Sequence, residues 1–476
     1  MTHRGLTDAG PRGDFRLAPI SLCVNTQTPL VQYLGNPDSG RLEAASRDPT
    51  DLTTLREGVD FQYSPGGVTR MVFPLVRRLL EAEVVGEVHW VALNPHAPPT
   101  VRLGKITLHN LALDGDRMAG YGEVKEAIWG RIHEIDAARP RDDLFWSEAF
   151  SEYAYYNRRT AEVIQQLDRT HDFDAFYIHD FQQMPVGHML ATVKPKIFRW
   201  HIPFDASVFP DQWRALLATY LDSYDMIVVS TASYAESLLA WRPEANVLRL
   251  YPYLDPADYG RPSRSTVAAT AKRLGLGPTD RVALVVARMD PMKGQDLAIR
   301  ALEGLREEYP ELRLVLVGNG SFSGSRSGLG LSKSATWRQH LEKEATARGV
   351  RDRVLFTGHV SQEDLDALYE RAEFTILPSI REGFGLVAVE SWLHRRPAIV
   401  TRRAGVAELI RDGVSGLLFD PDRPEELEKR MRQLLDDRSG RLRARLVRNG
   451  RVASRQCTLD AAAKAEEAML VGATEA

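Results

Sequence analysis

The sequence predicts an α/β protein built from two doubly wound domains, each a parallel sheet covered by helices. From residue 17 onward, short β-branched runs alternate with longer amphipathic helical patterns. Several of these runs, such as 282–287 (VALVVA), are continuously apolar, as expected of strands that are buried on both faces. The second half repeats strand and helix five or six times at spacings of about 20 to 40 residues, which is typical of a doubly wound sheet.

Each expected strand is a run of four to eight apolar and β-branched residues that is followed by a polar or glycine-containing loop. In the first half these runs are 19–24, 88–93, 106–113, 174–179, 197–201 and 226–230. In the second half they are 282–287, 312–317, 354–357, 374–378, 398–401 and 416–419. The tail from about 424 to 470, dense in Arg, Leu and Ala, is expected to be helical.

The chain divides where its composition changes. Residues 1–16 are expected to be flexible, 17–250 to form the first Rossmann-like domain, and 281–432 the second. Between them, 251–280 is rich in Pro, Gly and small polar residues and is predicted to be a linker, while 433–476 is predicted to be a helical return segment. Two such domains face one another across a cleft, and their ligands bind at the carboxyl ends of the strands.

Composition excludes several classes of function. The formal net charge is 61 − 64 = −3, which gives no global attraction for nucleic acid or an anionic membrane. No window approaches the roughly 18 apolar residues that span a bilayer, and the amino-terminal residues lack the apolar core of a secretory signal. Only two cysteines occur, so a disulfide scaffold is excluded. We expect a cytoplasmic protein that acts on small molecules as a monomer or homodimer.

The most informative motif is residues 379–390, Ser-Ile-Arg-Glu-Gly-Phe-Gly-Leu-Val-Ala-Val-Glu. It follows an expected strand and begins a helix, with Glu382 in the loop and Glu390 in the helix. Backbone amides at a helix amino terminus suit anionic oxygen, and carboxylates accept hydrogen bonds from sugar hydroxyls. An arbitrary pair of glutamates at this spacing is usually a solvated turn, but the Gly-Phe-Gly-Leu insert after a buried strand favours a binding site.

Two cations follow the first strand of the same domain. Arg288 and Lys293 lie five residues apart on one loop and can together bind a diphosphate. This spacing alone is common among solvated surface charges. A diphosphate-binding role is nevertheless favoured, because the loop belongs to the same domain as Glu382.

In the first half, Gly66 and Gly67 begin an amphipathic helix and permit close approach of an anion to the backbone. The same residues equally fit a plain helix start, with Ser64 as its cap.

Two strand ends in the first half are unusually polar. One reads Ile-His179-Asp180-Phe-Gln182 and the other reads Arg-Trp-His201-Ile-Pro-Phe. A single histidine is more often structural. Two histidines at the carboxyl ends of strands are predicted to point toward the cleft between the domains. The histidines lack the helical spacing of metalloproteases and no cysteine cluster accompanies them, so we predict no metal.

Together these residues resemble the retaining glycosyltransferases of the GT-B fold, family 4 in the usual classification. The resemblance covers nearly the whole chain and is strongest from 281 to 432. The segments that begin at His179 and at Trp200 look most like trehalose glycosyltransferring synthases, and His201-Ile-Pro-Phe204 is locally similar to trehalose-6-phosphate synthases.

The resemblance implies a nucleotide-sugar donor, such as UDP-, ADP-, GDP- or TDP-glucose, and no cofactor or metal. It implies catalytic roles for His201, Arg288, Lys293 and Glu382, with the two cations neutralising the leaving diphosphate. The implied donor-binding residues are Gly66, Gly67, Phe384, Gly385, Leu386, Val387 and Glu390, and the implied acceptor-binding residues are His179, Asp180 and Gln182.

The acceptor is expected to be a sugar. The acceptor segments 178–188 and 199–214 contain only Arg199 and Arg214 as fixed cations, and Asp180 would repel a phosphate. Free glucose, giving trehalose, is therefore the predicted acceptor. The alternatives are a trehalose-6-phosphate-synthase-like enzyme, transfer to glycerate or glycerol, a nucleotide-sugar epimerase or hydrolase, and a binding protein on the same fold.

Overall fold

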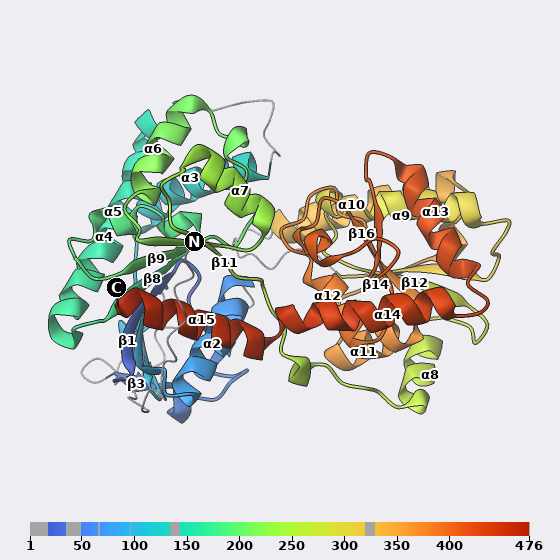
Figure 1. Cartoon of the computed structure of the whole chain (residues 1–476), viewed down its shortest axis with the longest axis horizontal. Helices are drawn as coiled ribbons and strands as arrows, with labels where there is room; N and C mark the ends of the chain where they lie inside the picture. Colours follow the sequence, from blue (N-terminus) through green and yellow to red (C-terminus); the bar gives the residue numbers. More distant parts are fainter. Residues whose placement is uncertain are drawn as a thin grey trace, which may run out of the picture.

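The computed structural model describes residues 18–34, 49–64, 67–95, 97–133, 143–318 and 329–475. The predicted flexible segment 1–16 and Gly66 lie outside these residues. The described chain forms two lobes, each built on its own sheet, and both doubly wound sheets are confirmed (Figure 1).

The described part of the first lobe contains a nine-stranded sheet in the order β11-β10-β9-β8-β1-β5-β7-β6-β3. All its neighbours are parallel except β6 and β7. The strands are β1 (Ile20–Thr26), β3 (Thr50–Asp51), β5 (Val85–Leu93), β6 (Thr100–Leu103), β7 (Ile106–Leu111), β8 (Ala175–His179), β9 (Lys196–Arg199), β10 (Met226–Val229) and β11 (Val247–Arg249), with a separate hairpin of β2 (Val31–Tyr33) and β4 (Phe61–Tyr63).

Helices cover both faces of this sheet, because alternate residues of its central strands are apolar on each side. Cys23 and Val91 face one core, and Val24 and Trp90 face the other. The first core is closed by α3 (Gly115–Ile132), α4 (Glu148–His171), α5 (Val186–Met189), α6 (Asp211–Leu221) and α7 (Ala232–Trp241). The second is closed by α2 (Gly67–Glu81) and α15 (Leu459–Thr474).

The second lobe has a six-stranded parallel sheet among its described residues, in the order β14-β13-β12-β15-β16-β17. Its strands are β12 (Arg281–Val286), β13 (Leu312–Val317), β14 (Val354–Gly358), β15 (Phe374–Leu377), β16 (Ala398–Thr401) and β17 (Leu417–Phe419). Its helices are α8 (Arg264–Arg273), α9 (Gln295–Leu305), α10 (Leu329–Ala347), α11 (Gln362–Arg371), α12 (Leu386–Leu393), α13 (Pro424–Leu435) and α14 (Arg441–Ser454). The strand order reverses between β12 and β15, which is where open α/β sheets bind ligands.

All twelve predicted strands are present, within a few residues at each end. Among the described residues, five short strands were not predicted, namely β2, β3, β4, β6 and β11. The β6 strand (Thr-Val-Arg-Leu) returns antiparallel to β7 through a tight turn at Gly104, whose φ is +58°. It is a short strand near the edge of the sheet with little apolar signal, and neither this strand nor its antiparallel pairing was predicted.

The segment 251–280, predicted to be a linker, contains a helix of its own. Helix α8 packs against α11, and Ala271 and Leu276 join the core of the second lobe. The extended part that crosses between the lobes pairs with the returning tail, because the Leu254 amide donates to the Cys457 carbonyl (2.9 Å) and the Leu459 amide donates to the Leu254 carbonyl (2.9 Å). The two segments that cross between the lobes, around Leu254 and around Cys457–Leu459, therefore lie side by side.

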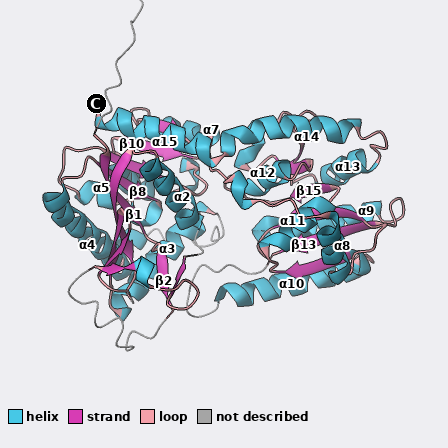
Figure 2. Cartoon of the chain, turned by 90° about the horizontal axis from the view of Figure 1, so that it is seen from below, coloured by secondary structure: helices cyan, strands magenta, loops and turns pink. Residues whose placement is uncertain are grey.

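After that crossing, the tail returns to the first lobe. Helix α14 lies along the second lobe and α15 along the first (Figures 1 and 2). Met469 and Leu470 of α15 pack into the same core as Ala175 and Tyr177 of β8. No helix among the described residues has the length and apolar character needed to cross a membrane.

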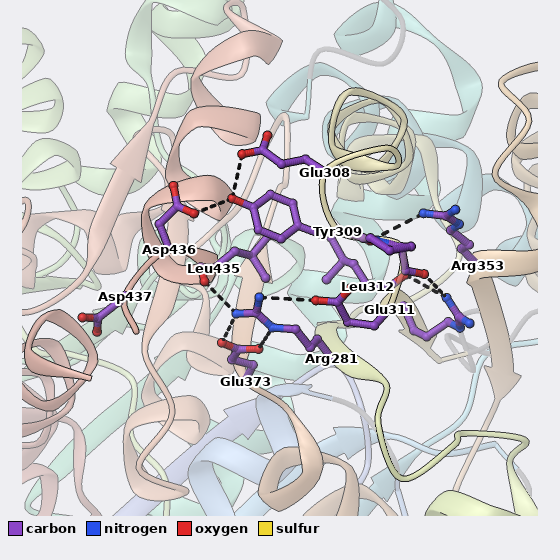
Figure 3. A network of polar contacts seen from close by, with 12 residues as sticks. Arg281, Glu308, Tyr309, Glu311, Leu312, Arg353, Glu373, Leu435, Asp436 and Asp437 are labelled. Atoms are coloured by element: carbon purple, nitrogen blue, oxygen red, sulfur yellow. Dashed lines mark hydrogen bonds and ion pairs between the residues drawn. The ribbon is translucent and has the colours of Figure 1, made fainter. Parts of the chain in front are cut away.

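A polar network at the amino ends of the second sheet holds its strands and α13 in place (Figure 3). Arg281, the first residue of β12, forms two hydrogen bonds to the Glu373 carboxylate (2.6 and 2.7 Å) and one to the Leu435 carbonyl (2.9 Å). Tyr309 donates to Asp436 (2.6 Å) beside it. This network lies at the end of the sheet opposite the strand-end loops, so it supports the fold and not the site.

Candidate active site

The cation loop follows β12. Asp290 caps the short 3-10 helix Pro291–Lys293, which turns the chain so that Lys293 faces the neighbouring loop after β15. Gly294 makes this possible, since its φ is +63° and a β-carbon there would lie 2.2 Å from the Pro378 carbonyl oxygen. The amide of Ile380 donates to the Met292 carbonyl (2.9 Å), which joins the two loops.

Lys293 and Glu382 form an ion pair on these joined loops. The Lys293 Nζ lies 2.8 Å from the Glu382 Oε2, which also accepts a hydrogen bond from the Ser379 hydroxyl (2.8 Å). Burial opposes ionisation of Glu382, but Lys293, Ser379 and the charge of Arg288 together lower the pKa of this carboxyl. Glu382 is therefore an anion at neutral pH, held between cations. Arg288 itself is exposed to solvent at the start of the loop.

The Gly-Phe-Gly turn places helix α12 directly behind Glu382. Gly385 has a φ of +94°, and a β-carbon there would lie 2.6 Å from the Leu377 side chain. The amides of Gly405 and Val406 donate to the carbonyls of Gly383 (2.9 Å) and Phe384 (2.7 Å), which fixes the turn. Phe384 packs its ring into the core, while Leu386 and Val387 begin α12, where amides have no partner within the helix.

Glu390 lies deeper along α12 and is bonded to two tyrosines. The Tyr369 hydroxyl donates to one carboxylate oxygen (2.6 Å) and the Tyr259 hydroxyl to the other (3.3 Å). Burial raises the pKa of Glu390 although both tyrosine bonds lower it. A ligand hydroxyl at Glu390 would share the carboxylate with these tyrosines or replace one of them.

In the first lobe, the ends of β8 and β9 place two histidines in contact. The Nδ1 atom of His179 lies 3.0 Å from the Nε2 atom of His201, and the rings stack with centroids 5.3 Å apart. Burial, the facing ring and Arg199 lower the pKa of His179, and burial and Arg199 lower that of His201. Both rings are therefore neutral at pH 7. The His179 Nε2 is buried and has no hydrogen-bond partner among the described residues.

Asp180 has an unusual backbone for a non-glycine residue, with a φ of +69°. Its amide donates to the Arg199 carbonyl (2.8 Å), and its carboxylate accepts from the Phe181 amide (3.1 Å). Burial raises the pKa of Asp180 to about 7, against hydrogen bonds from the backbone of Phe181 and His201 that lower it. Strained backbone together with a perturbed carboxyl is typical of functional sites. Gln182 is half-buried in the short helix that follows.

A hollow of about 820 Å³ separates the lobes beside Glu382. The first lobe contributes Ile132, Pro203, Phe204, Asp205, Ser233, Tyr234 and Ser237, and the second Ile380, Arg381, Glu382, Arg402, Arg403, Ala404, Gly405, Ala407 and Glu408. The lobes touch at its edge, where the Tyr234 hydroxyl donates to the Gly383 carbonyl (3.0 Å).

The structure thus brings together Lys293 with Glu382, and His179 with His201 and Asp180. Glu390 belongs to neither group and is bonded instead to Tyr369 and Tyr259. Gly67 is the first residue of α2, and Gly66 lies outside the described residues.

Sequence reasoning missed His133 and three arginines. His133 caps the end of α3, and burial lowers its pKa, as do the charges of Arg288, Lys293 and Arg381, although a bond to the Trp129 carbonyl raises it. His133 of the first lobe therefore lies near enough to the cation loop for its charges to act on the imidazole. Its only sequence signal is its place at the end of an amphipathic helix, which does not reveal a site.

Arg381, Arg402 and Arg403 line the hollow on the side of the second lobe. Burial and the charge of Arg403 lower the pKa of Arg381, so the two guanidinium groups are near one another. Arg381 lies within the glutamate motif, but nothing in the sequence shows that the loop after β16 joins it.

Comparison with known proteins shows the family and the fold. The family described as "Glycosyl transferases group 1" matches residues 268–453, and "Trehalose synthase, N-terminal domain" matches residues 145–236. Relatives named D-inositol 3-phosphate glycosyltransferase occur in Acidothermus cellulolyticus, 36% identical over 80% of this chain and 80% of the relative, and in Salinispora arenicola, 34% identical over 81% and 82%.

Solved structures share the fold. A trehalose-phosphate synthase from Burkholderia xenovorans in complex with glucose-6-phosphate superposes with a TM-score of 0.71 at 16% identity, over 95% of this chain and all of that one. A sucrose-phosphate synthase from Thermosynechococcus elongatus gives a TM-score of 0.65 at 18% identity, over 95% and 98%. Since relatives more than 30% identical span four fifths of the sequence and the fold is GT-B, the chain belongs to the group 1 glycosyltransferases.

Proposed function

We propose that this glycosyltransferase moves a glucosyl group, with retention of configuration, from a nucleoside-diphosphate glucose to a hydroxyl of a sugar-like acceptor. The observation that carries the proposal is the Lys293–Glu382 pair beside Arg288 at the carboxyl ends of β12 and β15, with His201, His179 and Asp180 at strand ends of the other lobe. The proposal assigns the diphosphate to the cations of the second lobe and the acceptor to the polar strand ends of the first lobe.

In this proposal the second lobe holds the donor. Arg288 and Lys293 stabilise the negative charge that develops on the leaving diphosphate, and the first-turn amides of Leu386 and Val387 add a partial positive charge. Glu382, kept ionised by Lys293 and Ser379, accepts hydrogen bonds from hydroxyls of the donor sugar.

The first lobe holds the acceptor. The bond between the anomeric carbon and the diphosphate breaks as the acceptor oxygen forms its bond on the same face. The acceptor proton passes to the leaving phosphate oxygen, so no carboxylate pair at hydrolase spacing is needed. His201, neutral at pH 7, contacts the transferring sugar, and Asp180 binds an acceptor hydroxyl.

Free glucose, which gives trehalose, is our first candidate for the acceptor. The match to the trehalose synthase amino-terminal domain spans His179, Asp180, Gln182 and His201. The buried Asp180 carboxyl suits a neutral hydroxyl better than a phosphate.

The arginines of the hollow favour a second candidate, a phosphorylated sugar or cyclitol. Arg381, Arg402 and Arg403 offer forked donors beside Glu382, and arginine forks bind phosphate in a bidentate manner. Arg402 and Arg403 also face Asp412 and Asp422, so a bound phosphate would compete with these carboxylates. The curated relatives named above act, by name, on a phosphorylated cyclitol.

A donor-by-acceptor matrix tests both candidates. UDP-, ADP-, GDP- and TDP-glucose are each combined with glucose, glucose 6-phosphate, D-inositol 3-phosphate, glycerate and glycerol, and NMR identifies the product and its anomeric configuration. Trehalose from glucose supports the first candidate. Rates more than tenfold higher with a phosphorylated acceptor, lost in Arg381→Ala, support the second. An inverted product, or donor consumption that is independent of every acceptor, would refute the proposed transfer.

A further inference from the structure

A cluster of histidines lies in the first lobe, outside the candidate active site. Glu87 and His89 stand two residues apart on β5 and so point to the same face of the sheet, and His171 is the last residue of α4, which covers that face. One ligand atom from each of these three side chains can be chosen so that all lie within 4.8 Å of one another.

The cluster already has the outer hydrogen bonds that metal ligands usually have. The Nδ1 atom of His89 lies 2.9 Å from the Nε2 atom of His109 on β7, so one ring donates to the other. When His89 donates, its Nε2 carries a free lone pair directed toward Glu87. The Ser21 hydroxyl donates to the Glu87 Oε1 (3.0 Å), which leaves Oε2 for a ligand. Such partners orient the ligating atoms.

The spacing suits a small transition-metal ion. The Nε2 atom of His89 lies 4.0 Å from the Glu87 Oε2, too far for a hydrogen bond. Ligands of a tetrahedral ion at about 2.0–2.1 Å from the metal are roughly 3.3 Å apart, so the cluster must contract by less than about 1.5 Å. The Glu87 side chain is 47% exposed and His171 lies at a helix end, so both can move, while His89 is buried and fixed.

We propose that Glu87, His89 and His171 bind one divalent transition-metal ion of the Zn²⁺ type, with water in the fourth position. Two imidazoles and one carboxylate are ligands that Zn²⁺ takes readily, whereas Mg²⁺ and Ca²⁺ prefer oxygen alone. The ion joins the end of α4 to β5 and thereby stabilises the first lobe.

The ion has no part in glycosyl transfer. Cys23 of β1 is in register with both His89 of β5 and Phe176 of β8. His179 is three residues beyond Phe176, which places the cluster about 10 Å further back along the strands than the acceptor residues. The site is therefore structural.

Calorimetric titration of the chelator-treated full chain with Zn²⁺ tests the site, with thermal unfolding as a second readout. We expect one ion per chain, a rise in Tm, and at least tenfold weaker binding in His171→Ala and Glu87→Gln, which both change mobile side chains. The matched control is His340→Ala, which removes a surface histidine that faces Glu344 without a second histidine and should leave Zn²⁺ affinity unchanged. Absence of saturable binding at one ion per chain, or equal affinity in the His171 and His340 variants, would overturn the proposal.

Discussion

Arg199 and Glu466 form a buried ion pair between the end of β9 and helix α15, with side chains only 4% and 1% exposed. The Tyr177 hydroxyl also donates to the Glu466 carboxylate (2.9 Å). Arg199 lies two residues before His201 and its carbonyl accepts the Asp180 amide, so the last helix of the chain supports the acceptor side of the candidate site. This pair links residues that are 267 positions apart.

We expect Glu466→Ala to lower the free energy of unfolding by about 3–5 kcal/mol, because it leaves the Arg199 charge buried without its partner. Chemical denaturation measures this loss. The double variant Arg199→Met, Glu466→Leu should lose much less, and Arg159→Ala, which breaks an exposed pair with Glu162, should change stability by about 0–1 kcal/mol. A loss in Glu466→Ala as small as in Arg159→Ala would show that the buried pair is not needed.

Lys293→Ala and Arg288→Ala should each lower turnover by at least about a hundredfold, since both are proposed to stabilise the charge of the leaving group. Steady-state kinetics with a saturating donor measures the change, and thermal unfolding verifies the fold. Lys343→Ala, which removes an exposed lysine from α10, is the control. Near-normal turnover in either variant would remove that residue from the mechanism.

Turnover should not change when EDTA is added, because Arg288 and Lys293 are proposed to supply the positive charge that stabilises the leaving diphosphate. The rate is measured before and after dialysis against the chelator. A rate that falls on dialysis and returns with added Mg²⁺ would contradict this mechanism.

Asp180 should make stability depend on pH. In the folded chain the Asp180 carboxyl keeps its proton up to about pH 7, whereas in the unfolded chain it releases the proton near pH 4. The native state therefore binds more protons than the unfolded state between these pH values. The stability contributed by this group is present at low pH and is lost as the pH rises toward 7. The variant Asp180→Asn lacks this titrating carboxyl. We therefore expect the difference in free energy of unfolding, variant minus wild type, to be larger at pH 8 than at pH 5 in urea titrations. An identical difference at both values would show that the Asp180 pKa is ordinary.

Binding of the donor should close the cleft, because we propose that its diphosphate contacts Arg288 and Lys293 on one lobe and Gly67 at the start of α2 on the other. We expect a nucleoside diphosphate to decrease the radius of gyration in small-angle scattering, and glucose alone to leave it unchanged. Gly67→Val should lower turnover more than nucleotide affinity. If the free and nucleotide-bound curves superimpose, this account of closure is wrong.

The sequence predicted those features of the fold and of the candidate site that depend on residues within one segment. Continuous apolar runs predicted both sheets, and the glutamate motif and the cation loop were both predicted to follow strands of the same domain. That these two strands are neighbours, so that Lys293 and Glu382 meet, was not predicted. Short strands near the sheet edge such as β6 were not predicted, since they carry almost no apolar pattern. His133 and the loop after β16 join the cleft only through tertiary packing, and the Arg199–Glu466 pair depends on the return of α15. None of these has a signal in its own segment.

The two crossings between the lobes have a mechanical consequence. A single connecting segment would let one lobe both tilt and swivel on the other. Here the backbone of Leu254 is hydrogen-bonded to Cys457 and Leu459 on the second crossing, so we expect the two bonded segments to resist swivelling more than tilting. Under the proposed mechanism, such tilting brings the donor sugar on one lobe to the acceptor on the other along a single arc. The proposed retention of configuration would then depend on the connection between the lobes as well as on the residues of the candidate site.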